Sequence, residues 1–195
     1  MKKVLLLLAE GFETYEASVF IDVIGWNQVE GDKSTQLFTC GLRPEIKSSF
    51  NHRFLVDYLV DDIDPQEFDA LAVPGGFEVF DFYKDAYDDR FLSLIRMFNA
   101  QSKIIASVCV GSLPIARSGV LINRRATTYN ITPKRQEELG SYEVNVINEP
   151  VVMDCNVITS WNPSTAMDVA FLLLERLTSK EQSNYIRSIM GFNLK

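Results

Sequence analysis

The chain has 195 residues, of which 47% are hydrophobic and 23% charged, and its formal net charge is −7 at pH 7. This length fits one domain with a sizeable core, and the apolar content excludes an intrinsically disordered chain. The acidic balance opposes general nucleic-acid binding, and no apolar run reaches the roughly 20 residues that span a bilayer. We therefore expect one cytoplasmic domain over residues 1–195, with no nucleic-acid or membrane partner.

The hydrophobic pattern predicts strands that alternate with helices along the chain. Continuous aliphatic runs are typical of strands buried on both faces, and apolar residues at helical spacing indicate helices that cover a sheet. In chain order, the predicted elements are a strand at 3–9, a helix at 14–29, strands at 35–40, 46–48 and 53–60, a short helix from Asp64, a strand at 69–73, a helix at 88–101, a strand at 103–108, a helix at 111–118, a strand at 126–128, a helix at 132–139, strands at 142–147, 151–153 and 157–159, and helices from Asn162 and over 180–192. This alternation predicts an α/β domain with a mostly parallel central sheet.

Local signals set several of these boundaries. The aliphatic run after Lys2-Lys3 is too short for a secretion signal and is followed at once by acidic residues, so we interpret it as a strand. Asp64, Pro65 and Glu67 have the spacing of a capped helix start with a capping-box acid. Thr132 is likewise predicted to cap the helix that follows it.

Three segments follow predicted strands and carry the chemistry of the sequence. They are residues 10–16, 74–77 and 108–111. In parallel α/β sheets, ligands bind at the carboxyl ends of the strands, where such segments meet. The functional site is therefore expected at this edge.

Cys109 stands between a buried strand and a helix, with Ser107 and Gly111 two residues away on either side. This is the pattern of a nucleophile elbow. Free N–H groups at the helix start favour a thiolate, and the Val110 N–H would point at an oxyanion formed there. Gly75 lets the neighbouring turn approach closely. A buried structural cysteine fits the same segment, so both interpretations stay open.

Cysteine and histidine counts exclude several other mechanisms. The three cysteines, at 40, 109 and 155, fit neither a disulfide framework nor a paired metal-ligand motif. The sequence has one histidine, His52, and lacks a dinucleotide-binding glycine motif and a P-loop. We expect reduced thiols, no metal and no cofactor.

Glu10, Glu13 and Glu16 follow the first strand. Each fits a simple role as an acid at a helix start, where the helix dipole stabilises it. An ionised carboxylate beside Cys109 would raise the pKa of the thiol by repulsion, whereas a protonated carboxyl would donate a hydrogen bond to a thiolate. A functional glutamate in this segment should therefore be neutral near pH 7.

Four motifs together resemble the ThiJ/PfpI superfamily, in the family's order and over nearly the whole chain. They are residues 8–13 with Glu16, residues 73–76, residues 106–111 and residues 158–166. The resemblance implies a flavodoxin-like three-layer sandwich related to class I glutamine amidotransferases, assembled as a homodimer. It also implies that Cys109 is the reactive cysteine, Glu16 its protonated partner, and Gly76 and Val110 the backbone donors of an oxyanion site.

The chain departs from this family at both usual histidine positions. Val110 stands where protease-like members have histidine after the cysteine, and Tyr129 stands where deglycase-like and glyoxalase-like members have it. His52 belongs to neither motif and is interpreted as a turn residue on the surface. Tyr129 and Trp161 are expected to line the pocket together with Gly75.

Three functions remain open from the sequence. The first is a stress-related protein whose Cys109 reacts with oxidants or small reactive molecules. The second is a cysteine-dependent amidase, glyoxalase or deglycase, which the motifs favour and the missing histidines oppose. The third is a binding protein that keeps the elbow without catalysis. The expected partner in each case is a small molecule or an oxidant.

Overall fold

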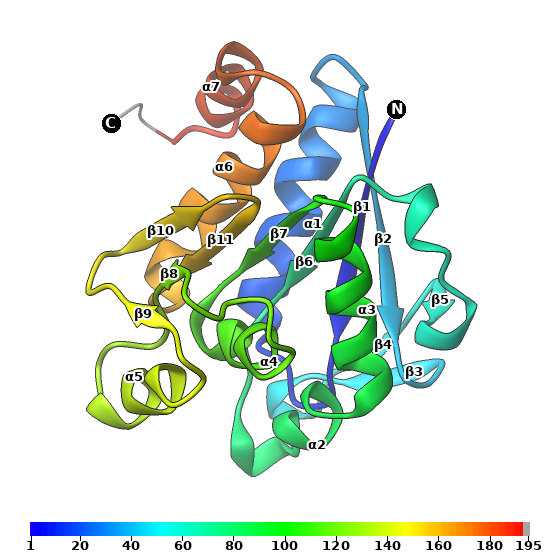
Figure 1. The fold of residues 1–195 in the computed structure, drawn as a ribbon. Coiled ribbons are helices and arrows are strands. Elements are labelled where there is room, and N and C mark those ends of the chain that lie inside the picture. Colours follow the sequence, from blue (N-terminus) through cyan, green and yellow to red (C-terminus); the bar gives the residue numbers. More distant parts are fainter. Residues whose placement is uncertain (193–195) are drawn as a thin grey trace.

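The computed structural model describes residues 1–192 and forms a three-layer α/β/α sandwich (Figure 1). In that part of the chain seven strands make the central sheet, in the order β10-β11-β7-β6-β1-β2-β5. Neighbouring strands run parallel, except for the antiparallel pair β10–β11. The strands span Lys2–Leu8 (β1), Thr35–Gly41 (β2), Tyr58–Leu59 (β5), Ala70–Val73 (β6), Ile104–Ser107 (β7), Val151–Asp154 (β10) and Val157–Ser160 (β11).

Helices cover both faces of this sheet. Figure 1 shows α1, α6 and α7 on one face and α2, α3 and α4 on the other. They span Thr14–Val29 (α1), Phe82–Ala86 (α2), Asp89–Ala100 (α3), Ser112–Arg117 (α4), Ala166–Leu177 (α6) and Lys180–Ile189 (α7). The arrangement confirms the predicted flavodoxin-like sandwich with its mostly parallel sheet.

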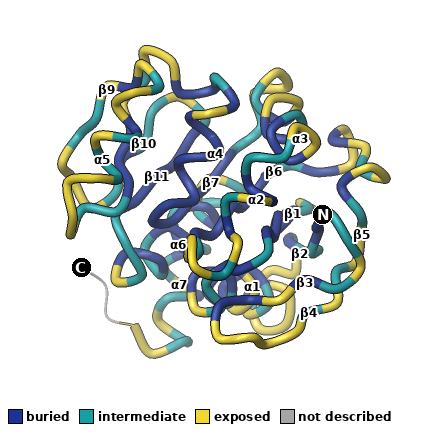
Figure 2. The backbone as a smooth tube through the Cα atoms, turned by 90° about the horizontal axis from the view of Figure 1, so that it is seen from below, coloured by how far each residue is buried: buried dark blue, intermediate teal, exposed yellow. Residues whose placement is uncertain are grey.

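Burial explains why the aliphatic runs form the centre. Residues 4–8 of β1 and all of β6 are buried, because helices cover the sheet on both sides. The tube drawn in Figure 2 shows these strands inside a rim of exposed loops and helix surfaces. In the part of the chain that the structure describes, no helix is both long and apolar enough to span a bilayer.

Short elements lie outside the central sheet. The hairpin of β3 (Glu45–Lys47) and β4 (Arg53–Leu55) is antiparallel, with His52 exposed at its turn. The predicted strand at 142–147 contracts to β9 (Asn145–Val146), which pairs with β8 (Arg125–Ala126) beside helix α5 (Pro133–Gly140). Asn145 is exposed and Val146 half-buried, in contrast to the fully buried residues of β6.

Two predicted helix starts differ in detail from the structure. Residues Pro65–Glu67 make one 3-10 turn, because the Phe68 N–H bonds to the Pro65 carbonyl before the chain enters β6. The Asp64 side chain accepts a hydrogen bond from the Gln66 N–H, and the expected capping box is not formed. Thr132 precedes α5 as expected, but its side chain makes no capping bond.

The segment after Gly76 folds into a turn that the sequence left unassigned. A 3-10 turn at Glu78–Phe80 leads directly into α2. Asp81 links them in a left-handed conformation with φ of 65°. This turn is the element that closes one side of the functional site described below.

Candidate active site

The three segments predicted to meet do lie together at the carboxyl edge of the sheet. An isolated bridge pairs Phe12 with Gly76. The Glu13 N–H donates to the Gly75 carbonyl at 2.8 Å, and the Phe77 N–H donates to the Gly11 carbonyl at 3.1 Å. The loop after β1 is thereby fixed to the turn after β6.

Cys109 occupies a strained turn, as the elbow pattern predicts. It lies between β7 and α4 with φ of 54°, a left-handed conformation that is unfavourable for a residue with a side chain. Its carbonyl accepts hydrogen bonds from the hydroxyls of Ser112 at 3.1 Å and Thr128 at 3.0 Å. These bonds hold the turn, in which Cys109 is 7% exposed.

Two glycines permit this close assembly. A Cβ on Gly111 would lie 2.4 Å from the Val73 carbonyl oxygen, so the elbow can pass β6 only with glycine there. A Cβ on Gly75 would lie 2.8 Å from Glu16 Oε2 and 3.1 Å from the Cβ of Cys109. The missing side chain of Gly75 therefore leaves the space in which Glu16 and Cys109 lie close together.

Glu16 is fully buried behind the cysteine. The Gly75 N–H donates to its Oε2 at 2.7 Å. Its Oε1 has no well-formed hydrogen bond within residues 1–192, although Cys109 and Glu13 stand beside it. Burial, and secondly the charge of Glu13, raise the pKa of Glu16 to about 8, with the Gly75 bond opposing. Glu16 is thus neutral at pH 7, which agrees with the sequence-based expectation for a functional acid.

The pKa of the Cys109 thiol is raised well above its ordinary value. Burial is the largest cause, and the nearby Glu16 charge adds to it. A hydrogen bond from the Val110 N–H acts in the opposite direction but does not prevail. The thiolate expected from the helix start is therefore not favoured. Helix α4 has only six residues, so its dipole is small, and the desolvated site outweighs it.

A cavity of about 460 Å³ opens beside the thiol. Cys109, Gly76, Val110 and Tyr129 all line it, as expected. Gly75 and Glu16 lie behind the cysteine rather than in the wall. Trp161 is half-buried outside the lining, and its buried indole N–H has no hydrogen-bond partner in the described part of the chain.

Seven further residues line the cavity that the sequence did not place there: Glu13, Phe77, Glu78, Val79, Thr132, Arg135 and Pro163. The first was interpreted only as an acid at a helix start. Phe77 follows the Gly75-Gly76 turn, so its position next to the site was a usable signal. Arg135 comes from α5, about 25 residues after the elbow, and no local pattern indicated it.

The charge of Arg135 is compensated inside the protein. Its guanidinium bonds to Glu78 at 2.8 Å and to Glu138 at 2.7 Å. It also lies over the Tyr83 ring, 4.8 Å from the ring centroid. Since Glu13 also faces the cavity, the lining offers no excess positive charge to an anion.

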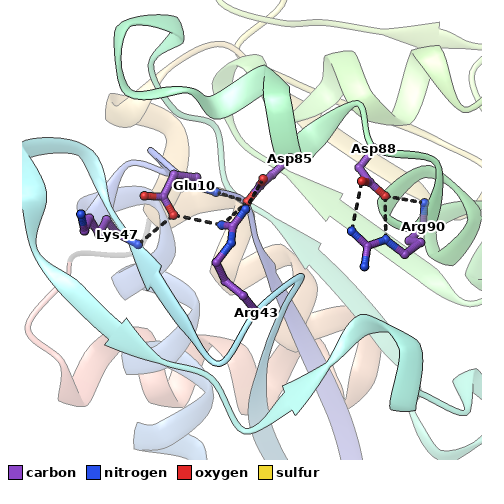
Figure 3. Close-up of polar contacts among 6 residues, drawn as sticks. All are labelled: Glu10, Arg43, Lys47, Asp85, Asp88 and Arg90. Atoms are coloured by element: carbon purple, nitrogen blue, oxygen red, sulfur yellow. Dashed lines mark hydrogen bonds and ion pairs between the residues drawn. The ribbon is translucent and has the colours of Figure 1, made fainter.

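Glu10 belongs to a supporting network next to the site rather than to the cavity. Figure 3 shows Arg43 between Glu10 and Asp85. The guanidinium bonds both Asp85 oxygens at 2.7 Å, and Asp85 also accepts the Glu10 N–H at 2.9 Å. This network ties the loop after β1 to α2. Within residues 1–192 no group of three or more acidic, histidine or cysteine side chains is arranged to hold a metal.

Several proteins of known sequence or structure are similar to this chain over most of its length. A deglycase of Pyrococcus horikoshii is 26% identical over 83% of this chain and 91% of its own length. Protein dj-1beta of Drosophila melanogaster is 29% identical over 93% of this chain and 92% of its own. The crystal structure of Drosophila DJ-1beta superposes with a TM-score of 0.85 at 24% identity, covering 99% of each chain.

The chain spans less than half the length of two plant relatives. Protein DJ-1 homolog A of Arabidopsis thaliana is 24% identical over 97% of this chain, but the match covers 46% of that protein. For homolog B, the covered share is 40%. The family model described as DJ-1/PfpI matches residues 2–176. The chain therefore belongs to the DJ-1/PfpI family.

Proposed function

We propose that the protein transforms reactive carbonyl compounds through Cys109. The observation that carries this proposal is the thiol at the wall of a 460 Å³ cavity, backed by the neutral carboxyl of Glu16. The Val110 N–H faces the sulfur and lowers the pKa of the thiol, and Gly76 lines the same wall. Membership of a family with a deglycase among its members supports a carbonyl substrate.

In the turn of residues 75–77, the Gly76 N–H is the hydrogen-bond donor that is available to a substrate. The Gly75 N–H is used by Glu16, and the Phe77 N–H by Gly11. A carbonyl oxygen near Sγ would accept from Gly76 and Val110. Such fixed donors stabilise the charge that develops on the oxygen during addition.

Glu13 supplies the proton transfer for which related enzymes use histidine. It lines the cavity, and burial raises the pKa of its carboxyl, which a bond to Glu16 partly opposes. A carboxylate whose pKa moves towards neutrality is a stronger base at pH 7. We assign Glu13 to take the thiol proton as Sγ attacks.

With methylglyoxal, Sγ bonds to the aldehyde carbon and the C=O electron pair moves to its oxygen. Glu13 passes the thiol proton to that oxygen, giving a hemithioacetal. The former aldehyde C–H proton then moves to the neighbouring carbon, and the O–H proton moves to the ketone oxygen. The product is a thioester of Cys109, and water cleaves it to release lactate and the free thiol.

Conversion of methylglyoxal to lactate tests this proposal. We expect turnover in the wild type and a loss of about 10²-fold or more in Cys109→Ser, because hydroxyl replaces the thiol. Cys155→Ser changes an exposed thiol outside the cavity lining and is the matched control. Activity that survives Cys109→Ser would exclude this nucleophile.

The role of Glu13 has its own control in the same assay. Glu13→Gln removes the base and keeps the shape, so a loss of about 10²–10⁴-fold is expected. Glu137→Gln makes the same change at an exposed site on α5 and should leave turnover unchanged. Equal activity in the two variants contradicts the assignment.

Oxidation of Cys109 is a second candidate function, because Glu16 Oε1 beside the sulfur lacks a well-formed hydrogen bond in the described residues. A protonated Oε1 can donate to a sulfinate. Two molecules of hydrogen peroxide are consumed: each adds one oxygen to the sulfur as its O–O bond breaks and water leaves, which gives the sulfenic acid first and then the sulfinate. Peptide mass spectrometry is expected to show sulfinate at Cys109 above Cys40 and Cys155. Equal oxidation at all three removes this function.

Two expectations about the protein's setting remain proposals. The homodimer and the cytoplasmic location derive from the family resemblance and from the composition. Light scattering at micromolar concentration distinguishes a dimer from a monomer.

A binding protein without catalysis is the third candidate function. It becomes the favoured one if Cys109 reacts with neither carbonyl compounds nor peroxide while small molecules still raise the melting temperature of the protein.

A further inference from the structure

The cavity has an apolar side that begins next to the reacting atoms. Phe77 directly follows Gly76, the donor proposed for the carbonyl oxygen, and Val79 lies two residues further. Both line the cavity, and Tyr129 and Pro163 add further apolar surface to the wall. A group attached to the substrate carbonyl would therefore lie beside Phe77.

An exposed aromatic cluster supports this wall. The rings of Phe50, Phe77 and Phe80 contact each other, with centroid distances of 5.9 Å, 5.8 Å and 6.4 Å. Phe50 is 63% exposed and Val79 81%. Exposed apolar patches mark ligand-binding grooves or contacts with another protein, and the positions of Phe77 and Val79 in the cavity wall favour a ligand.

The volume and charge of the cavity further restrict the size and charge of a ligand that can bind there. At about 460 Å³ it lies in the range of pockets that enclose drug-sized molecules, far more than a three-carbon aldehyde fills. The carboxylates of Glu13 and Glu78 face it, and the charge of Arg135 is already balanced by Glu78 and Glu138. An anionic substrate would be repelled.

We propose that the site selects uncharged carbonyl compounds that carry an aryl or branched alkyl group, and that Phe77 and Val79 determine this selectivity. The inference rests on the proposed reaction at Cys109, since it names the substrate class for that thiol. Such compounds are favoured over methylglyoxal, which the site still converts, and over anionic 2-oxo acids.

Alkylation tests the selectivity without requiring turnover. N-phenyliodoacetamide and iodoacetamide each form an S–C bond as iodide leaves, and they differ by one phenyl ring. The quantity compared is the alkylation rate with N-phenyliodoacetamide divided by the rate with iodoacetamide. This ratio at Cys109 is normalised by the same ratio at exposed Cys155 in the same sample. We expect a normalised ratio of about 10, because part of the phenyl ring is buried in the cavity. Because both probes need the same thiolate, the pKa of Cys109 cancels.

Variants assign the selectivity to the wall. Phe77→Ala is expected to lower the normalised ratio to about 2 or less, since the first ring that meets the phenyl group is removed. Leu55→Ala removes an exposed side chain on β4 and should leave the ratio unchanged. A ratio near 1 in the wild type overturns the proposal. So does a Phe77→Ala variant that changes only the association state in sedimentation, because the cluster would then be an interface between copies.

Binding and turnover separate this inference from the proposed function. In Cys109→Ser, acetophenone should bind about tenfold more tightly than acetone when titrated by NMR. Equal binding overturns the selectivity even if methylglyoxal is converted. Conversely, tighter acetophenone binding with no turnover of methylglyoxal or phenylglyoxal retains the selectivity and removes the reaction.

Discussion

The free energy of unfolding of the wild type is expected to fall between about pH 5 and 8, and Glu16→Gln is expected to abolish this fall. The folded protein holds the Glu16 proton with a pKa of about 8, whereas the ordinary value is 4.5. Below pH 4.5 both folded and unfolded chains are protonated, so this stabilisation is fully present. As pH rises towards 8, only the folded chain keeps its proton, and the stabilisation is lost progressively. At 1.36 kcal/mol for each tenfold change, the loss reaches up to about 5 kcal/mol.

Glutamine is neutral at every pH, so the contribution of residue 16 to the free energy of unfolding should hardly change with pH in the variant. At pH 8 the variant should therefore be more stable than the wild type. Urea unfolding at pH 5, 6, 7 and 8 measures this difference. Glu137→Gln, at an exposed position on α5, serves as the matched control and should follow the wild type. Parallel profiles for wild type and Glu16→Gln would show that Glu16 is ionised in the folded protein.

The same variant reports on the thiol. The Glu16 charge is the second cause, after burial, of the raised pKa of Cys109. Removing that charge should move the pH midpoint of Cys109 alkylation downwards, while burial keeps it above that of an ordinary thiol. A midpoint that does not move would leave burial as the cause of the raised pKa.

The framework of this site was accessible from the sequence because it depends on local patterns. The aliphatic runs that became β1, β6 and β7 are buried on both faces, and parallel strands bring their carboxyl ends together. The elbow at Cys109 and the close turn at Gly75 follow from small residues at fixed spacing. The pairing of Glu16 with the thiol came from family resemblance.

The rest depends on contacts between distant segments. The pKa of Cys109 is set by burial, which the short helix α4 cannot offset. Arg135 reaches the cavity because α5 packs beside the elbow from a segment with no motif of its own. Trp161 resembles a pocket residue in its motif, yet the wall is formed by Pro163 instead. Sequence spacing records none of these packing outcomes.

Arg43→Met is expected to lower the free energy of unfolding by about 3 kcal/mol. Asp85 is 3% exposed in its side chain and receives both guanidinium bonds from Arg43 at 2.7 Å. Without the arginine, a buried carboxylate is left beside the Glu10 carboxylate, and among residues 1–192 the Glu10 N–H is then its one remaining hydrogen-bond donor. The cost falls at the lower end of that for breaking a buried ion pair, because Arg43 itself is 43% exposed.

Arg90→Met is the matched control, since Figure 3 shows Arg90 paired with Asp88 near the first network. Arg90 is 48% exposed, and its partners Asp88 and Asp61 are 30% and 63% exposed, so water replaces the lost contacts and the unfolding midpoint should hardly change. Thermal and urea unfolding of both variants measure the difference. Because the Arg43 network ties the loop that carries Glu13 to α2, Arg43→Met should also slow methylglyoxal conversion at temperatures where the variant is folded. Equal midpoints for the two variants would mean that Asp85 finds another partner or that the backbone bonds of the loop, such as those of Glu13 with Gly75 and of Gly11 with Lys47, hold it without Arg43.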